Sequence, residues 1–429
     1  MTTPIPRRTF LGSAAATVAL AALPSHAAES PPGPKIRLGL IGCGWWGLID
    51  ATAALKSGGA EVVAVCDIDS EHLAAAVEEI AKLQGSRPKA FKLYEELLAV
   101  DGLQAVIIAT PPQWHALPFI AACARGLDIY CEKPLAYDIR EGRAMVEAAS
   151  KGKNIVQIGF QRRQAAAFAE ARKHIQAGNS GRIISAEAQI HYTAGTPDPT
   201  PTAPPASLDW DLWCGPGPLI PYSAAVGHKS WRLEKTTGHG HLADWGIHLI
   251  DTARWILGLG APVAITSAGG LYHLKGKITT PDILTTHFEF AECPLTWRHR
   301  IWGAQDFDAA TSNGIFLYGE KETVFCTDNR WVVLPKGRDA KPQVHESQSD
   351  SSALHVAEFL EAVRTRKQAS VSTAEAHLST TAVKLAMISY ETGSKLVWDA
   401  ATEGIPGNPE AAKLLKREYR APWTHPFKA

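Results

Sequence analysis

Residues 36–47 read IRLGLIGCGWWG, a short apolar run that leads directly into a glycine-rich turn. Gly42, Gly44 and Gly47 fill the three glycine positions of a dinucleotide-binding fingerprint. The first glycine permits a tight turn, the second lets the backbone approach a pyrophosphate, and the third lets the next helix pack closely on its strand. A helical pattern follows the turn, and a second apolar run follows that helix. The sequence therefore predicts a dinucleotide site at this turn.

Asp67 follows the second apolar run and lies 20 residues after Gly47. A carboxylate in this position hydrogen-bonds the 2′-hydroxyl of an adenosine ribose. A 2′-phosphate would meet like-charge repulsion there, and the surrounding CDID segment at 66–69 contains no arginine or lysine. The sequence therefore favours NAD over NADP.

The remaining pattern divides the chain into two folded parts. Residues 35–160 alternate continuous apolar runs with helical segments, which is typical of a parallel, doubly wound sheet. We predict a Rossmann domain over 35–160, an α+β domain with a large open, mostly antiparallel sheet over 161–395, and a C-terminal extension over 396–429. Two late helices, at 354–365 and 374–392, are expected to return across the domain junction.

A long loop interrupts the second domain. Residues 195–221 contain eight prolines, a density that excludes regular secondary structure. Long ordered loops tend to be functional, so this loop is of interest.

The first 27 residues have the pattern of an export signal. Arg7 and Arg8 precede an alanine-rich apolar run at 10–23, and Ser-His-Ala at 25–27 suits a signal peptidase. The paired arginines resemble a twin-arginine signal, whereas an ordinary secretory signal or an uncleaved anchor is the alternative. We expect export to the periplasm or beyond by the twin-arginine route, with no membrane span after signal removal.

Composition limits the classes of partner. Lys plus Arg and Asp plus Glu both total 43, so no charge excess indicates nucleic acid.

Export and a dinucleotide site are in apparent conflict. Free NAD is scarce outside the cytoplasm, and the twin-arginine route carries folded proteins. A cofactor that is loaded before export and held tightly reconciles the signal with the dinucleotide site.

Two further clusters carry chemistry. Lys133 follows a buried strand, at the carboxyl edge where open α/β sheets bind ligands. Asp244 and His248 are four apart in a helix predicted over 242–257 and share one face. Such a pair suits acid–base work, because the carboxylate can orient the imidazole and adjust its pKa. A surface lysine and a solvated polar stripe are the alternatives.

The glycine turn, Glu-Lys-Pro at 132–134 and the Asp-x-x-x-His helix together resemble the Gfo/Idh/MocA family, named for glucose–fructose oxidoreductase and inositol dehydrogenase. The resemblance covers essentially the whole chain after the leader. It implies a Rossmann domain, a second domain whose open sheet covers the nicotinamide site, and a homodimer or homotetramer. It also implies that Lys133, Asp244 and His248 are catalytic, with His248 as base, Lys133 stabilising an alkoxide and Asp244 orienting the site. In some relatives the lysine is the acid–base group instead.

The resemblance and the motifs predict two sets of contact residues. The predicted cofactor-binding residues are Gly42, Gly44, Trp45, Trp46, Gly47, Asp67, Thr110, Pro111, His115, Glu132, Lys133 and Gln161. The predicted sugar-binding residues are Arg162, Arg163, Tyr192, Trp231, His241, Asp244, Trp245 and His248. No metal is predicted: His239 and His241, with His228 upstream, are spaced for chelation, but no nearby cysteine or glutamate completes the set.

Three functions fit these residues. The first is an exported NAD-dependent oxidoreductase that transfers hydride between a ring hydroxyl of a sugar or glycoside and a tightly bound cofactor. The second is an NAD-dependent glycosidase, in which transient oxidation acidifies a neighbouring C–H and the aglycone leaves by elimination. The third is a non-catalytic sugar-binding or regulatory protein. Residue spacing does not separate the first two, because their hydride chemistry is the same.

Overall fold

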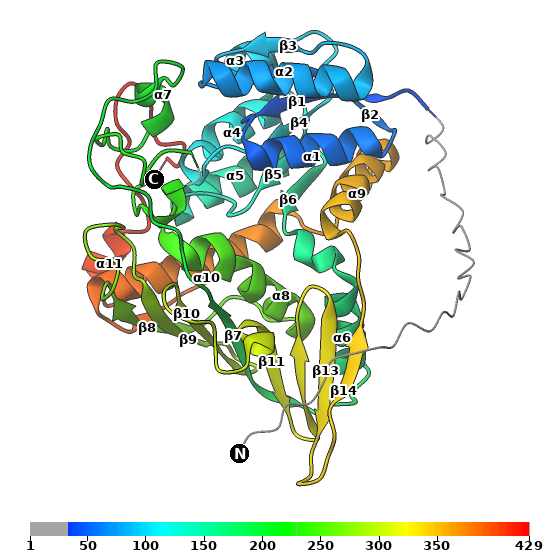
Figure 1. Cartoon of the computed structure of the whole chain (residues 1–429), viewed down its shortest axis with the longest axis vertical. Coiled ribbons are helices and arrows are strands. Elements are labelled where there is room, and N and C mark those ends of the chain that lie inside the picture. Colours follow the sequence, from blue (N-terminus) through cyan, green and yellow to red (C-terminus); the bar gives the residue numbers. More distant parts are fainter. Residues whose placement is uncertain (1–32, 229, 429) are drawn as a thin grey trace, which may run out of the picture.

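The computed structural model describes residues 33–228 and 230–428, so the predicted leader at 1–27 lies outside the described residues. Figure 1 shows a parallel sheet in the upper part of the molecule and a second, larger sheet below it, with α8 and α10 between them. No helix among the described residues is long and apolar enough to cross a membrane.

The first sheet has six parallel strands in the order β3-β2-β1-β4-β5-β6. The order reverses between β1 and β4, and this switch point is where open α/β sheets bind dinucleotides. Helices α1, α2, α4 and α5 lie between consecutive strands, as the alternating pattern predicts. The strands are β1 (Ile36–Ile41), β2 (Ala60–Cys66), β3 (Lys89–Phe91), β4 (Ala105–Ile108), β5 (Asp128–Glu132) and β6 (Val156–Gly159), and the helices are α1 (Trp45–Lys56), α2 (Ser70–Gln84), α3 (Tyr94–Leu98), α4 (Ala116–Ala124) and α5 (Ile139–Lys151).

The second sheet has nine strands in the order β14-β13-β12-β11-β7-β10-β9-β8-β15. Its pairs are antiparallel except for β7 with β10. The strands are β7 (Ile183–His191), β8 (Ala264–Gly270), β9 (Ile283–Glu289), β10 (Pro294–Arg300), β11 (Asn313–Gly319), β12 (Glu322–Cys326), β13 (Arg330–Pro335), β14 (Gln343–Glu346) and β15 (Leu396–Val397).

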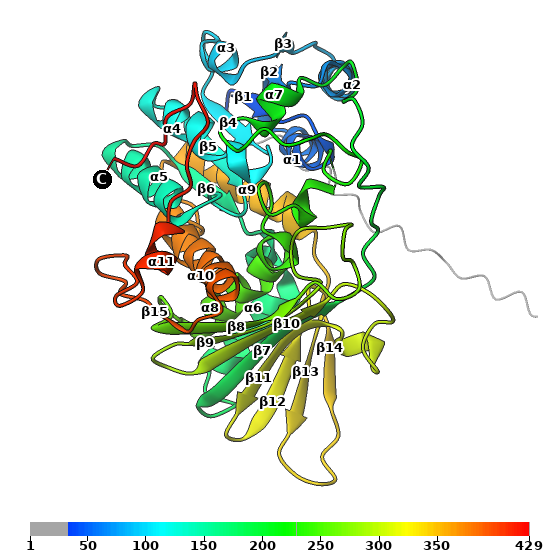
Figure 2. The same ribbon diagram turned by 90° about the vertical axis from the view of Figure 1, so that its left-hand side faces the viewer.

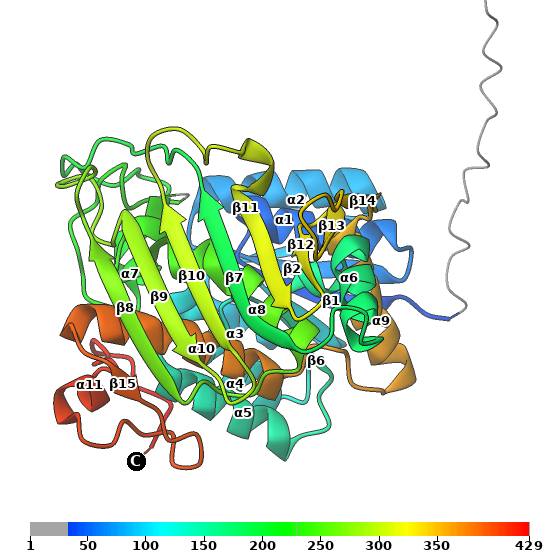
Figure 3. The same ribbon diagram turned by 90° about the horizontal axis from the view of Figure 1, so that it is seen from below.

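One face of this sheet is covered by helices, whereas strands β7 to β11 lie uncovered in the view from below (Figures 2 and 3). The covering helices are α6 (Ala166–Gln176), α8 (Ile247–Leu257) and α10 (Thr373–Thr392). Burial alternates along β9 and β10, which is the pattern of an antiparallel sheet with one packed face. The predicted fold class is confirmed.

The last part of the chain ties the two sheets together. Val356, Phe359 and Leu360 of α9 (Ser351–Thr365) are buried in one core with β1, so this helix returns across the domain junction as predicted. Strand β15 pairs with β8, so the second sheet extends past residue 395 into the segment predicted to be an extension. The tail continues through α11 (Pro409–Lys413).

Candidate active site

A lysine–aspartate pair joins the two domains. Lys133 follows β5 of the first sheet, and its Nζ donates to Oδ1 of Asp244 at 2.9 Å and to the Asp244 carbonyl oxygen at 2.7 Å. The exposed fractions of the two side chains are 14% and 8%. The structure therefore brings together two of the three predicted catalytic residues, although they are more than a hundred positions apart in sequence.

Arg232 is a third member of this cluster that the sequence analysis missed. It lies in the short helix η3 (Ser230–Leu233), and its Nε is 3.1 Å from Oδ2 of Asp244. Burial disfavours ionisation of Asp244, but the charges of Lys133 and Arg232 outweigh it and hold the pKa of that carboxyl below its usual range. No motif marks Arg232, because only the fold brings η3 to the aspartate.

His248 does not pair with Asp244 as predicted. The expected continuous helix over 242–257 begins instead as a π-helical turn, η4 (Leu242–Gly246), and becomes α-helical only at α8. Its wider turn changes the i,i+4 relationship, and Lys133 and Arg232 occupy the carboxylate. Among the described residues, no hydrogen bond joins Asp244 to His248, so the predicted orienting contact is wrong.

The electrostatics of His248 follow from burial and charge. Burial, and next the positive charge of Lys133, place the pKa of its imidazole well below the usual range. The ring is therefore neutral at physiological pH, and its buried Nδ1 has no hydrogen-bond partner. The free nitrogen gives the ring a place to take a proton, whereas the lowered pKa makes it a weaker base than an ordinary histidine.

A pocket of about 450 Å³ opens beside the lysine–aspartate pair. Its lining includes Tyr192, Arg232, His241, Asp244 and Trp245. Both ring nitrogens of His241 are buried without a partner, and its ring packs against Tyr192 with centroids 4.8 Å apart. The pocket therefore offers an aromatic wall and unsatisfied polar atoms, which are features of a site for a small polar ligand.

The other predicted sugar-binding residues differ in whether the structure supports a contact with substrate. Arg162 is buried, with Nη1 unpartnered and Nε 3.1 Å from Asp328. Arg163 instead donates to both carboxylate oxygens of Asp251, at 2.8 and 2.7 Å, in the buried interior. Arg163 therefore neutralises a core aspartate, and the structure does not support its predicted contact with substrate. Trp231 packs with the aromatic cluster of Trp210 and Trp213 and does not line the pocket.

The glycine turn has the geometry of a dinucleotide site. A Cβ on Gly47 would lie 2.1 Å from the Gly42 carbonyl oxygen, whereas a Cβ on Gly44 would meet nothing within 4 Å. Helix α1 has no side-chain cap at its N-terminus. The rings of Trp45 and Trp46 lie edge to face there, with centroids 5.4 Å apart. Backbone N–H groups at such an end bind phosphate. The turn therefore leaves room and donors for a pyrophosphate.

The acid after β2 is fixed beside this turn. Asp67 accepts from the backbone N–H of Cys43 at 2.7 Å and from that of Asp69 at 2.9 Å. Thr110, in the loop that Pro111 continues after β4, has a buried hydroxyl without a partner. These residues fit the ribose and phosphate groups of NAD.

His115 has a structural contact rather than an open nitrogen. Its Nδ1 is 2.8 Å from the Pro134 carbonyl oxygen, and its Nε2 is 2.8 Å from that of Thr110. Since both ring nitrogens are engaged, His115 connects the loop after β4 to the loop after β5. The structure does not support the predicted direct contact of its side chain with a cofactor.

A buried carboxyl network lies behind Lys133. Glu132 accepts from Nε2 of Gln161 at 2.6 Å and from the backbone N–H of Lys133 at 3.2 Å. Asp50 of α1 is fully buried next to Glu132, and burial raises the pKa of both carboxyls. Asp50 carries no sequence signal. The network fixes the backbone from which Lys133 projects.

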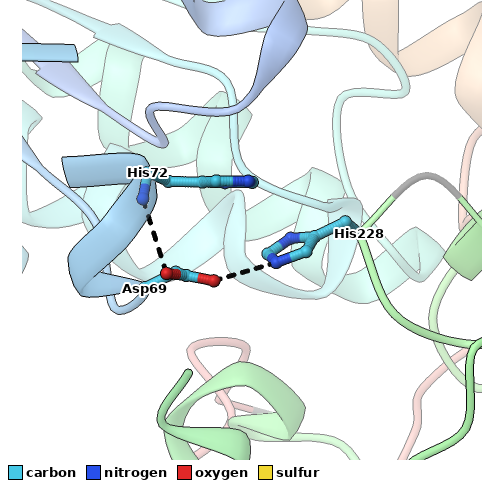
Figure 4. A group of neighbouring side chains, drawn as sticks. All are labelled: Asp69, His72 and His228. Atoms are coloured by element: carbon cyan, nitrogen blue, oxygen red, sulfur yellow. Dashed lines mark hydrogen bonds and ion pairs between the residues drawn. The ribbon is translucent and has the colours of Figure 1, made fainter. Parts of the chain in front are cut away.

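The predicted histidine pair does not form a metal site with His228. His239 lies 2.6 Å from Nζ of Lys384, whereas His228 lies beside Asp69 and His72 (Figure 4). The rings of His72 and His228 stack with centroids 4.1 Å apart and planes tilted by 33°. The three histidines that the sequence spaces for chelation therefore lie in two separate places.

Comparison with known proteins identifies the family. The model of the oxidoreductase family with an NAD-binding Rossmann fold matches residues 36–160. The GFO/IDH/MocA C-terminal domain matches 168–324, and the oxidoreductase-family C-terminal alpha/beta domain matches 312–425. The chain belongs to the Gfo/Idh/MocA family. Its first domain is an NAD-binding Rossmann domain.

Two relatives with similar sequences are inositol dehydrogenases. Inositol 2-dehydrogenase 4 of Saccharopolyspora erythraea is 35% identical over 254 residues, covering 58% of this chain and 63% of the relative. The scyllo-inositol 2-dehydrogenase (NAD(+)) of Bacillus subtilis is 30% identical over 237 residues, covering 55% and 57%. The chain thus spans less than two thirds of the length of these curated relatives.

Solved structures share the fold at lower identity. A levoglucosan dehydrogenase in complex with NADH and levoglucosan has a TM-score of 0.67 at 19% identity, covering 85% of this chain and 99% of that one. The aldose–aldose oxidoreductase of Caulobacter crescentus, complexed with glycerol, has a TM-score of 0.66 at 18% identity, with the same coverage.

Proposed function

We propose that this protein is an NAD-dependent oxidoreductase that acts on a CH–OH group in the ring of a sugar or glycoside. The observation that carries the proposal is the Lys133–Asp244 pair, to which each domain contributes one residue beside a pocket with unsatisfied polar atoms. The inositol dehydrogenase relatives support a polyhydroxylated substrate.

The charge state of each site residue indicates its role in the reaction. Oxidation of a secondary alcohol requires loss of the hydroxyl proton as hydride leaves carbon, and NAD supplies the hydride acceptor when it is bound. We assign the proton to His248 because its buried Nδ1 has no other partner, although burial and the charge of Lys133 make it a weak base. Lys133 donates a hydrogen bond to the developing alkoxide, and Asp244 holds the ammonium in place. Arg232 keeps Asp244 ionised without removing it from Lys133.

The pocket wall suits a sugar. Tyr192 and Trp245 line the pocket with aromatic rings, and 44% of Trp245 is exposed. Such faces pack against the apolar faces of sugar rings. The unpartnered nitrogens of His241 then pair with ring hydroxyls, since a neutral imidazole has one donor and one acceptor.

Retention of NAD, export and assembly are further parts of the proposal. The twin-arginine-like leader supports export of the folded protein, and a cofactor held through the catalytic cycle would not need an external NAD supply. For the assembly, a homodimer or homotetramer, the uncovered face of the second sheet is the contact surface that we propose.

A proton NMR time course of the mature protein with a panel of glycosides in heavy water tests the function. A keto-sugar or keto-glycoside with the aglycone still attached is the expected product. Free aglycone with deuterium next to the oxidised carbon, and no lasting keto product, would instead support the glycosidase. Absence of any hydride exchange between NAD and the panel would contradict both enzymatic functions and favour a sugar-binding protein.

A further inference from the structure

The proline-rich loop of the second domain crosses to the first. We name residues 193–228 the strap: they leave the second sheet after β7 and include the short helix α7 (Trp210–Cys214). The expectation of no regular structure over 195–221 is therefore wrong at α7, which lies between the prolines at 205 and 216. Figure 1 shows α7 beside the parallel sheet, and Figure 2, which faces that side, shows it in front of β1 and β4. The strap therefore lies next to the edge of the sheet where dinucleotides bind.

The strap bonds to the loop that follows β2. Ser70 donates its backbone N–H to the Ser207 carbonyl at 2.9 Å, and Asp209 donates to the Ile68 carbonyl at 3.2 Å. Asp69 and Leu208 form an antiparallel bridge between these two contacts. The three residues of the first domain come directly after Asp67, the predicted ribose ligand.

The strap also bonds to the loop that follows β4. Nε1 of Trp114 donates to the Leu212 carbonyl at 2.8 Å, and Nε2 of Gln113 donates to the Trp213 carbonyl at 3.3 Å. Gly215 has a φ of +55°, and a Cβ there would lie 2.4 Å from the Trp114 ring, so α7 packs closely on this loop. Because β1 lies between β2 and β4, the strap bridges the two loops across the switch point.

Specific side chains hold the strap in this position. Nζ of Lys92, just after β3, lies 2.6 Å from Oδ2 of Asp209. His228 contacts Asp69 at 3.0 Å and stacks on His72, as Figure 4 shows. On the outer side, Arg420 of the C-terminal tail bonds Asp211 at 2.7 Å.

The strap has an interior of its own. Trp210 and Trp213 stack with centroids 4.5 Å apart, and they are buried with Leu208 and Cys214 in a small cluster that includes Ile68 of the first domain. An ordered segment of this kind costs little further entropy when it closes over a ligand.

We propose that the strap completes the adenosine half of the NAD site and closes it against exchange of the dinucleotide. This inference rests on the proposed function, since it names the part of the chain that retains the cofactor. The adenosine of a dinucleotide lies beside the acid after β2, and the strap bonds the neighbouring residues on both sides of that crevice. NAD therefore leaves only after the strap detaches from at least one of the two loops.

The test measures the rate at which NAD leaves the mature protein. Bound NADH is displaced by excess NAD⁺ and its loss is followed by fluorescence. Lys92→Ala is expected to accelerate dissociation several-fold, and Lys92→Ala with His228→Ala at least tenfold. The matched control is Lys395→Ala, because Lys395 forms an ion pair with Glu289 of the same length, 2.6 Å, and nearly equal exposure on the second sheet. The control should stay within twofold of the wild type.

Two results would overturn the inference: dissociation from both strap variants at the wild-type rate, or tighter NAD binding by them, which would make the strap a competitor of NAD. Hydrogen exchange gives a reading that needs no variant. In the wild type, NAD should slow amide exchange in residues 207–215, and unchanged exchange would contradict closure. Rapid loss of NADH from the wild type itself would refute cofactor retention, whereas the ratio of variant to wild-type rates would still decide the role of the strap.

Discussion

Lys133→Met removes the ammonium from the candidate active site while keeping a side chain of similar length. The change deletes the two hydrogen bonds to Asp244, at 2.9 and 2.7 Å, and the donor to the developing alkoxide. Loss of one such donor costs about 10²–10³ in kcat, or about 2.7–4 kcal/mol of transition-state stabilisation. We therefore expect turnover to fall by at least about a hundredfold.

The same substitution should leave the fold and the cofactor site intact. Breaking a buried ion pair costs about 3–5 kcal/mol when it leaves an uncompensated charge. Asp244 retains Arg232 at 3.1 Å, so its charge stays compensated and the loss of unfolding free energy should be smaller. NAD affinity should remain within about twofold, because Asp67 and the glycine turn lie at other strand ends.

The assay is the rate of NADH formation in a single turnover with a substrate identified by the NMR panel. Thermal unfolding and NAD titration run in parallel, and Lys395→Met, an exposed lysine of the second sheet, serves as the control. A Lys133→Met protein that keeps more than a tenth of the wild-type rate would remove this lysine from the chemical step. Loss of NAD binding together with activity would show that Lys133 acts through the cofactor site or the fold.

Two further predictions concern buried charges outside the pocket. Arg163→Ala removes two hydrogen bonds from the buried Asp251 carboxylate and leaves it the Ser379 hydroxyl and the charge of the nearby Arg254. It should therefore lower the unfolding free energy in urea, by less than the about 3–5 kcal/mol of a fully uncompensated buried charge, while the folded enzyme keeps its kcat. Lost activity at unchanged stability would show that Arg163 contacts the substrate. Glu403 is the second case: burial opposes its ionisation, but hydrogen bonds from His377 and Arg143 hold its pKa at about 2, against 4.5 for an unperturbed glutamate. A lowered folded-state pKa contributes stability that is present above about pH 4.5 and lost as the pH falls toward 2, so Glu403→Gln should weaken the acid dependence of the urea midpoint between those values. An equally steep decline in the variant would contradict this assignment.

Local sequence determined the fold of the first domain and the place of its candidate ligand site. Apolar runs such as 36–41 and 105–108 are buried on both faces, so their composition alone indicates parallel strands. Gly42 has a φ of +94°, which favours glycine, and a Cβ on Gly47 would clash with the Gly42 carbonyl oxygen five positions earlier, so both requirements are local. The position of Lys133 follows from the strand before it, because a parallel sheet places all carboxyl ends at one edge.

Only the tertiary structure decided which charges meet in the candidate site. The i,i+4 spacing of Asp244 and His248 predicts a pair, but Lys133 reaches the carboxylate from 111 positions away and Arg232 from a neighbouring helix. A π-helical turn also alters the spacing. The same limit applies to Arg163, whose partner Asp251 is 88 positions away, and to the strap, whose contacts lie on another domain. Periodicity reports which face of an element is buried. It carries no information on which distant charge satisfies a buried group, because that depends on how the elements pack.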